Sequence, residues 1–160
     1  WVGITYHFQL YANLNWFGKY FGYAFVLEGL LLCLWDLLLR PENSERMTNQ
    51  IQYVGKGLSV FGLIGYPLIT PLLGGPWAGS HLFGISPDAT AVGTIGFILF
   101  VPNQRWLLLA LPITWCLIST LESFALGLFG SALPMVIVII IALCSWSMDR
   151  WVQAQTTGAD

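Results

Sequence analysis

The chain has 160 residues, of which 56% are hydrophobic and 9% are charged, and its mean hydropathy is +0.71. A soluble domain carries about 25% charged residues on average, so this composition excludes a soluble enzyme, a disordered tail and a disulfide-rich secreted module. Six basic residues against eight acidic ones give a formal net charge of −2, which leaves no basic surface for a nucleic acid. The composition instead predicts a multi-pass membrane protein.

The start of the chain and its cysteines give two further expectations. The chain begins at Trp1 without an initiator methionine, and it lacks the charged start and short apolar run of a signal peptide. We therefore expect additional segments upstream of this residue. Cys33, Cys116 and Cys144 lie within apolar runs and have no CxxC or zinc-site spacing, which is typical of small hydrophobic residues in helices.

Five apolar segments are long enough, or nearly long enough, to cross a bilayer as helices, for which about 20 mostly apolar residues are needed. The second segment contains Pro67 and Pro71, which should kink it or end it early. No segment has the sustained alternation that marks membrane strands. The sequence therefore predicts an all-α, polytopic bundle of about five membrane-spanning helices, forming one domain over residues 1–160. The segments are 16–39, 56–73, 87–101, 105–129 and 132–148.

Turn and capping residues separate these segments in a way that favours helices. Ser86 can cap the exposed N–H groups of the third helix, Pro87 suits its first turn, and Asp88 faces the positive end of its dipole. We expect Asp88 to act structurally there rather than to bind an ion. The glycine-rich stretch 74–86 predicts a structured outer loop, and the polar stretch 1–15 predicts an interfacial segment or the tail of an upstream element.

The basic residues predict an orientation in the bilayer. With five spanning helices, five of the six basic residues fall on one side, together with the C-terminus. Cytoplasmic loops carry an excess of Lys and Arg, so this side is predicted to be cytoplasmic and the start of the chain to face outward. The five residues are Arg40, Arg46, Lys56, Arg105 and Arg150, and the exception is Lys19.

Glu28 is the ionisable residue predicted to lie deepest in the membrane. Counted from Trp16 at 1.5 Å per residue, it lies about 18 Å along its helix, near the middle of a core about 30 Å thick. A charge there costs about 2.5–3.5 kcal/mol to insert, so Glu28 is a candidate proton or cation site. The alternative is a neutral carboxyl that faces the bundle and donates a hydrogen bond to Tyr66 or to a carbonyl near Pro67. Glu122 is a further intramembrane polar candidate, in the outer third of its segment.

Three polar residues on the outward side are the remaining candidates for a binding site. With Glu122, they supply the atom types that bind a metal or a haem, but their spacing is not that of a metal site. We therefore expect ordinary interfacial histidines, no bound metal and no cofactor. The three residues are His7, His81 and Asp88.

Gly18 and Gly22 form a GxxxG pattern at the start of the first segment. Small residues four apart let two backbones approach closely, so this pattern predicts helix packing. Walker A, HExxH and GxSxG patterns are absent from the sequence, and no catalytic residue is predicted. We expect the chain not to be an enzyme.

Several blocks of the sequence are similar to those of a known family. They are Tyr11–Trp16, Phe25–Glu28, Gly65–Leu68, Phe83–Thr90, Trp106–Leu108 and Trp115–Ile118. The Pro-Asp-x-Thr block at 87–90, at a loop-to-helix boundary, is the most specific of them. Over residues 6–145 the chain resembles an uncharacterised bacterial family of multi-pass membrane proteins, catalogued as domain of unknown function number 6064. The resemblance implies a membrane fold, an inner-membrane location and further N-terminal segments, and it implies no activity.

Three functional hypotheses follow. The first is a non-catalytic integral membrane protein that acts by association, as an accessory or structural subunit of a larger membrane complex, because its short loops leave no room for a soluble active site. The second is a small transporter or channel-like protein with Glu28 as its proton or cation site. The third is a membrane protein that binds a cofactor or lipid through the outward histidines and the tryptophans. The expected partners are the lipid bilayer and other membrane subunits, not nucleic acid.

Overall fold

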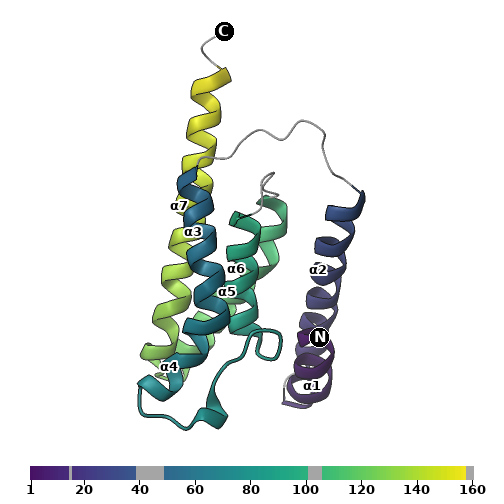
Figure 1. The fold of residues 1–160 in the computed structure, drawn as a ribbon. Coiled ribbons are helices and arrows are strands. Elements are labelled where there is room, and N and C mark those ends of the chain that lie inside the picture. The colour runs from purple at the N-terminus through teal and green to yellow at the C-terminus, as the bar shows by residue number, and fades with distance from the viewer. Residues whose placement is uncertain (15, 39–48, 101–105, 158–160) are drawn as a thin grey trace.

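The computed structural model describes residues 1–14, 16–38, 49–100 and 106–157 (Figure 1). All regular elements in these ranges are helices, which confirms the predicted all-α class. In chain order, with η for π- and 3-10 helical segments, they are η1 (Gly3–Tyr11), α1 (Ala12–Leu14), α2 (Gly18–Leu38), α3 (Asn49–Val60), η2 (Phe61–Gly65), α4 (Tyr66–Leu72), η3 (Trp77–Gly79), α5 (Pro87–Phe100), η4 (Trp106–Leu109), α6 (Ala110–Ala125) and α7 (Phe129–Thr157).

The long helices run alternately up and down, side by side (Figure 1). The main bundle consists of α3, α5, α6 and α7, and α2 with η1 forms an N-terminal hairpin beside it. The lower end in Figure 1, which holds α1, α4 and the loop 73–86, is called the loop end here. At the opposite end, the C-terminal part of α7 projects beyond the other helices.

The second predicted segment is a longer and more continuous helix than expected. It begins at Asn49 rather than at Lys56, and Ile51 in its first turn is fully buried in the core. Pro67 does not end the helix, because the π turn of η2 comes directly before it. A π turn adds a residue to the helical turn and so relieves the contact between a proline ring and the preceding carbonyl. The helix ends at Leu72, just after Pro71.

α6 ends earlier than predicted, and α7 extends further at both ends. The segment predicted over 105–129 stops being helical after Ala125. Gly127 follows with a φ of +72°, a left-handed conformation that commonly terminates helices. α7 continues past its predicted end, and there Asp149 accepts a hydrogen bond from Nε1 of Trp106 at 3.1 Å. This bond holds the far part of α7 against η4.

The N-terminal stretch, predicted to lie at the membrane interface, is helical in its described part. Its segment η1 packs along α2 and forms a hairpin with it. Glycines bring the two backbones together. A Cβ built on Gly3 would lie 2.6 Å from the carbonyl oxygen of Gly22, and one built on Gly18 would lie 2.7 Å from the backbone nitrogen of Ala12. Gly18 and Gly22, from which helix packing was predicted, make close contacts within the chain.

The closest packing in the main bundle joins the α3–η2 segment to α5, where backbone meets backbone. A Cβ built on Gly62 would lie 2.5 Å from the nitrogen of Gly93, and one built on Gly55 would lie 2.6 Å from a backbone atom of α5. Gly96 of α5 meets the backbone of Ser59 in the same way. Such contacts between small residues are typical of helices packed inside a membrane. Large buried residues fill the space around this contact: Ile51, Val92, Ile95, Leu99, Met135 and Val138.

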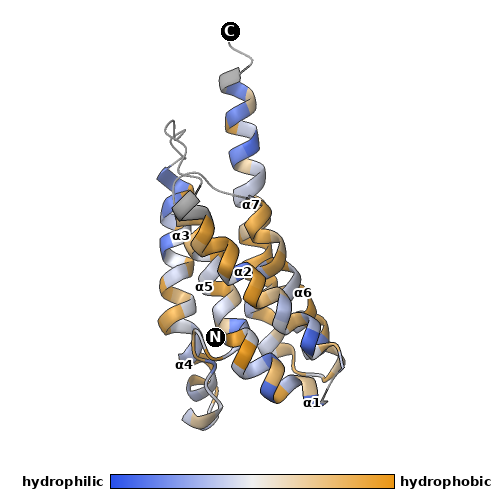
Figure 2. Cartoon of the chain, turned by 90° about the vertical axis from the view of Figure 1, so that its right-hand side faces the viewer, coloured by the Kyte–Doolittle hydropathy of each residue, from blue (hydrophilic) through white to orange (hydrophobic). Residues whose placement is uncertain are grey.

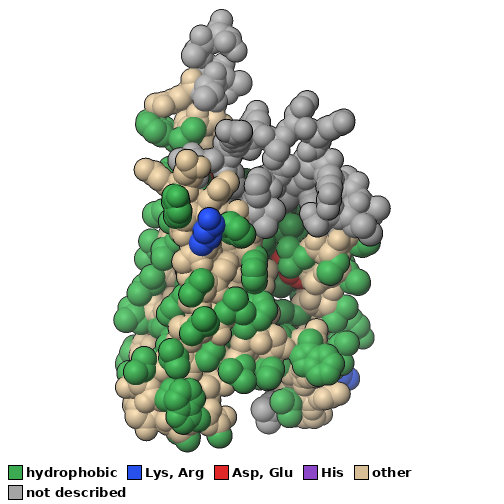
Figure 3. Space-filling model, in the orientation of Figure 1, with side chains coloured by type: hydrophobic (Ala, Val, Ile, Leu, Met, Phe, Trp, Pro, Cys, Tyr) green, Lys and Arg blue, Asp and Glu red, His purple; other side chains and the backbone are tan. Residues whose placement is uncertain are grey.

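Two helical segments in the described part of the chain are long and apolar enough to cross a membrane. They are Trp106–Ala125, with a mean hydropathy of 1.7, and Phe129–Gln155, with a mean hydropathy of 2.2. The helix Pro87–Phe100 is apolar but shorter. Figure 2 shows hydrophobic colour over α2, α6 and most of α7, and hydrophilic colour at the projecting end of α7. Hydrophobic side chains also cover much of the outer surface seen in Figure 3.

Candidate functional site

Asp88, in the first turn of α5, joins three parts of the molecule near the loop end. Its Oδ1 accepts a hydrogen bond from Nε1 of Trp115 on α6, over 2.9 Å. Its Oδ2 lies 3.7 Å from Nδ1 of His81 in the loop before α5. The His81 ring in turn packs edge-on against Tyr66 of α4, with the ring centroids 6.0 Å apart. Asp88 therefore contacts side chains of α6 and of the loop before α5.

Ser86 does not cap α5, contrary to the prediction, because its Oγ is buried without a hydrogen-bond partner in the described chain. Thr90 makes the local polar contacts instead. Its hydroxyl accepts a hydrogen bond from the Gly84 N–H at 2.9 Å and donates one to the Ser86 carbonyl at 2.6 Å. Gly84 has a φ of +80°, which glycine adopts without strain. The Thr90 hydroxyl thus holds the loop residues Gly84 and Ser86 against the first turn of α5.

Tyr11 fastens the N-terminal hairpin to the same end of the bundle. Its hydroxyl donates a hydrogen bond to Oε1 of Glu122 on α6, over 2.5 Å. Tyr6 lies on the same segment, where burial raises the pKa of its phenol and the carboxylates of Asp88 and Glu122 raise it further. Glu122, predicted as an intramembrane polar candidate, is exposed and serves as the link between η1 and α6.

His7 is fully buried, with 0% of its surface exposed, inside a cage of aromatic rings. The cage consists of Tyr6, Tyr11, Phe21, Phe25 and Trp115. Phe25 stacks on His7 and Trp115 packs edge-on against it, each with a centroid distance of 4.9 Å. Neither ring nitrogen has a hydrogen-bond partner in the described residues. Burial lowers the pKa of His7 to about 4, so the ring is neutral near pH 7.

The outward candidates predicted from the sequence therefore gather at one end but do not form one site. His7 is sealed in its cage, whereas the side chain of His81 is 47% exposed beside Asp88. In the ranges that the structure describes, no group of three or more His, Cys, Asp or Glu side chains could hold a metal ion. Trp115 connects the two environments, because it bonds to Asp88 and packs against His7.

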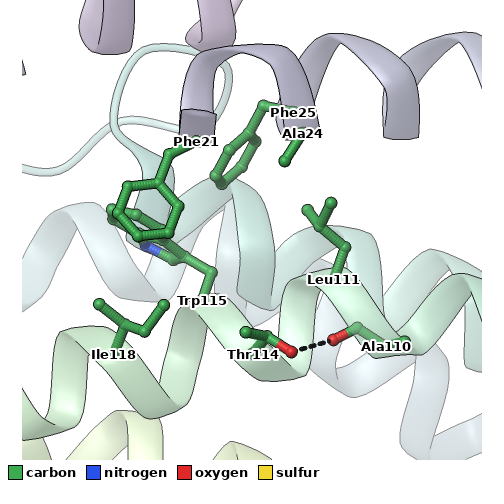
Figure 4. A pocket seen from close by; sticks show the side chains of 8 residues that line it. All are labelled: Phe21, Ala24, Phe25, Ala110, Leu111, Thr114, Trp115 and Ile118. Carbon is green, nitrogen blue, oxygen red and sulfur yellow. Dashed lines mark hydrogen bonds between the residues drawn. The ribbon is translucent and has the colours of Figure 1, made fainter. Parts of the chain in front are cut away.

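A pocket of about 340 Å³ opens between α2 and α6 (Figure 4). Phe21 and Phe25 of α2 and Trp115 of α6 point toward it. The polar side chain in its wall is Thr114, whose hydroxyl already donates a hydrogen bond to the Ala110 carbonyl at 2.7 Å. The pocket is therefore almost entirely apolar. Its lining residues are Phe21, Ala24, Phe25, Ala110, Leu111, Thr114, Trp115 and Ile118.

Glu28 faces the bundle, as predicted, and is 7% exposed. Oε1 of Glu28 has no hydrogen-bond partner in the described chain, and Tyr66 packs against Phe61 and His81. On α2, Glu28 follows Phe21 and Phe25 at helical spacing, so it lies on the same face, one turn beyond the residues that line the pocket. A buried carboxyl whose Oε1 has no partner among the described residues thus lies one helical turn beyond the pocket lining.

The match with a known family extends over nearly the whole chain. Residues 1–155 match DUF6064, a family of unknown function. The chain belongs to the DUF6064 family. No curated protein and no solved structure matches it. The DUF6064 match covers the resemblance expected from the sequence blocks, and it includes Glu28, Asp88 and Trp115.

Two features of this DUF6064 chain were missed in the sequence. The bond between Trp115 and Asp88 joins residues 27 positions apart, so its detection required the packing of α5 against α6. The pocket was signalled weakly by Phe21 and Phe25, which lie four residues apart and hence on one helix face. Glu28 lies seven residues after Phe21 and so on the same helix face, and this part of the site was predictable.

Proposed function

We propose that the chain is an integral protein of a bacterial cytoplasmic membrane that spans the bilayer five times and works by association with other membrane proteins. The five spans are α2, the α3–α4 segment, α5, the η4–α6 segment and α7. The loop end faces outward and the projecting end of α7 faces the cytoplasm, in line with the excess of basic residues on that side. The role is non-catalytic.

Apolar faces turned away from the bundle support membrane insertion. Large aliphatic residues on α2 and α7 are 46–56% exposed, although they lie in the middle of long helices. Water would disfavour contiguous apolar surface of this kind, whereas lipid or a neighbouring membrane helix would cover it. The residues are Leu27, Leu30, Leu34, Ile137 and Ile140.

The projecting end of α7 is the observation that carries the proposed association. In Figure 1 this end stands clear of the other helices, and Trp151 on it is 62% exposed next to the exposed Arg150. Tryptophan and arginine are the residues most enriched where protein partners bind strongly. We therefore place the partner-binding surface on this end, at the cytoplasmic face.

Site-specific photo-crosslinking tests the association. A photoreactive residue replaces Trp151 in one variant and Trp16, which is 69% exposed at the loop end, in a matched control. We expect a crosslinked protein of one defined mass from position 151 and only lipid adducts from position 16. Lipid adducts alone from both positions would contradict a partner at the α7 end.

Cysteine labelling tests the five spans. Single cysteines replace Ser80 in the outer loop and Ser44, which lies outside the described residues. With five spans, a membrane-impermeant reagent labels the two positions from opposite sides. Labelling of both from the same side would refute this arrangement.

A second candidate function is a transporter or channel-like protein with Glu28 as its proton or cation site. The specific observation in its favour is that the Glu28 carboxyl is buried, faces the bundle and has no partner on Oε1. Intramembrane carboxyls in such positions commonly serve ion pathways. Proteoliposomes test it: Glu28→Gln should abolish proton-coupled flux while thermal stability is unchanged. Equal flux in both proteins would remove this candidate.

A further inference from the structure

We propose that the pocket between α2 and α6 binds a lipophilic cation, with the charge balanced by Glu28 and the apolar groups held against Phe21, Phe25 and Trp115. The proposal rests on the second candidate function, the cation site at Glu28, and names the class of its substrate.

The environment of Glu28 disfavours an ionised carboxylate that has no positive partner. The carboxyl is buried, and no hydrogen bond or ion pair to another described residue compensates it. An ionised carboxylate in such a place is strongly disfavoured unless it is paired. The carboxyl therefore holds either its own proton or a cation that enters the pocket, and the two compete for the same oxygen atoms.

The pocket wall selects the kind of cation. A small inorganic ion needs several oxygen ligands, and among the residues that line the pocket only Thr114 supplies a side-chain oxygen. An apolar wall instead favours a cation that carries its own hydrocarbon groups. The pocket volume of about 340 Å³ is at the lower end of small-molecule sites, which measure about 300–1,000 Å³.

The aromatic rings supply the second element of recognition. Trp115 packs edge-on against Phe21 and Phe25, with ring centroids 5.2 Å and 5.5 Å apart, and all three rings line the pocket (Figure 4). The faces of aromatic rings attract cations, most strongly where water is excluded. Rings at one end of the pocket and a carboxyl one turn beyond it match a diffuse positive charge surrounded by apolar groups. In Figure 3, acidic atoms are visible recessed between hydrophobic side chains.

Equilibrium binding of tetraphenylphosphonium to the full chain in mild detergent tests the proposal. We expect saturable binding at one site per chain. Glu28→Gln, which keeps the size of the side chain and removes its charge, should weaken binding at least tenfold. Glu122→Gln removes the same charge at the loop end and still offers an oxygen to Tyr11, so it should bind like the parent chain. Tetraphenylborate, an anion of similar size, should not compete.

The possible results distinguish an error in the proposed class of ligand from an error in the proposed cation site at Glu28. Equal binding to the Glu28→Gln variant, or equal competition by tetraphenylborate, would show a pocket that does not recognise charge and would overturn the proposal. Phe25→Leu is a second variant that keeps Glu28; it should weaken tetraphenylphosphonium binding several-fold, and unchanged binding would contradict the role of the rings. Absence of binding together with Glu28-dependent proton flux would refute only the ligand class. Absence of both would refute the cation site itself.

Discussion

Two helix interfaces in this chain are built in opposite ways. Where the α3–η2 segment meets α5, glycines bring backbone against backbone, and a single added Cβ on Gly62 would lie 2.5 Å from Gly93. Where α2 meets α6, large rings keep the helices apart, and a pocket of about 340 Å³ is left between them. The first interface leaves no room for movement or for a ligand, whereas the second leaves room for both.

The difference assigns separate roles to the two halves of the molecule. Close backbone packing gives many weak contacts at fixed geometry, so the main bundle is the rigid part. The N-terminal hairpin is held to α6 mainly by ring contacts and by the hydrogen bond from Tyr11 to Glu122. Four substitutions or changes of conditions test this contrast, and we expect the largest effect at the glycine interface.

Gly55→Ala should cause the largest loss of stability. The added Cβ would lie less than 3 Å from backbone atoms of α5, which cannot move aside as a side chain can. Overpacking of this kind costs about 1–3 kcal/mol, and occasionally more. Gly57→Ala on the same helix is the matched control, because a Cβ there meets nothing within 4 Å. The control should be as stable as the parent or up to about 1 kcal/mol more stable, because alanine favours helix.

Thermal unfolding of both variants in the same detergent measures this difference. Equal melting temperatures for the Gly55 and Gly57 variants would show that the α3–α5 interface can open, and the contrast with the ring interface would then disappear.

Trp115→Phe should destabilise by about 1–3 kcal/mol, because it leaves Oδ1 of Asp88 without its indole donor. Asp88→Asn should be nearly neutral, since the amide oxygen still accepts that bond, and Asp88→Ala should cost more than Asn. Trp77→Phe, at an exposed residue, is the control and should have no effect. Detergent stability of the four variants decides the matter; an effect of Trp77→Phe equal to that of Trp115→Phe would contradict the role of this bond.

Glu28→Leu should raise stability by about 1–3 kcal/mol. The hydrogen bond expected from the sequence would have made this substitution destabilising, but Oε1 of Glu28 has no hydrogen-bond partner among the described residues. Removing a buried polar group without a partner relieves its desolvation cost. Glu28→Gln keeps a polar group there and should leave stability unchanged. Chemical or thermal unfolding compares the two variants, and a destabilised Leu variant would point to a partner of the carboxyl.

Lowering the pH should loosen the hairpin by a smaller amount through His7. Burial lowers the pKa of His7 to about 4, against about 6.5 in an unfolded chain. The folded state therefore stays neutral while the unfolded state takes up a proton, so stability is complete above about pH 6.5 and falls as the pH drops toward 4. His7→Phe should remove this part of the pH dependence. Melting temperatures between pH 7.5 and pH 5 measure it, and identical slopes for the two proteins would exclude His7 as the cause.

The fold was predictable where it depended on runs of apolar residues. These runs place α2 and α5 within two residues of their observed ends. A long apolar run can be identified as a helix without knowing which helices pack against it. The path through Pro67 was not predictable in the same way, because the π turn before it depends on how the α3–η2 segment fits the backbone of α5 at Gly93.

Parts of the candidate site were predictable for a similar reason. The inward direction of Glu28 was predicted from the cost of exposing a carboxyl to lipid, and this prediction does not depend on which helices are neighbours. Its supposed partner Tyr66 required a knowledge of which helices are neighbours, and Tyr66 belongs to α4, where it meets His81. The cage around His7 required the same knowledge, because its rings come from three separate elements.

The Thr90 hydroxyl has a consequence for how any molecule reaches the interior. Because it bonds to both Gly84 and Ser86, it clamps the loop to the start of α5 and removes the hinge that a movable lid over the loop end would need. In the membrane arrangement proposed above, the loop end would therefore act as a fixed surface rather than as a gate. In that arrangement we expect a ligand to reach the pocket between α2 and α6 from the bilayer, so that its concentration in the bilayer, rather than in water, would set how often the pocket is filled.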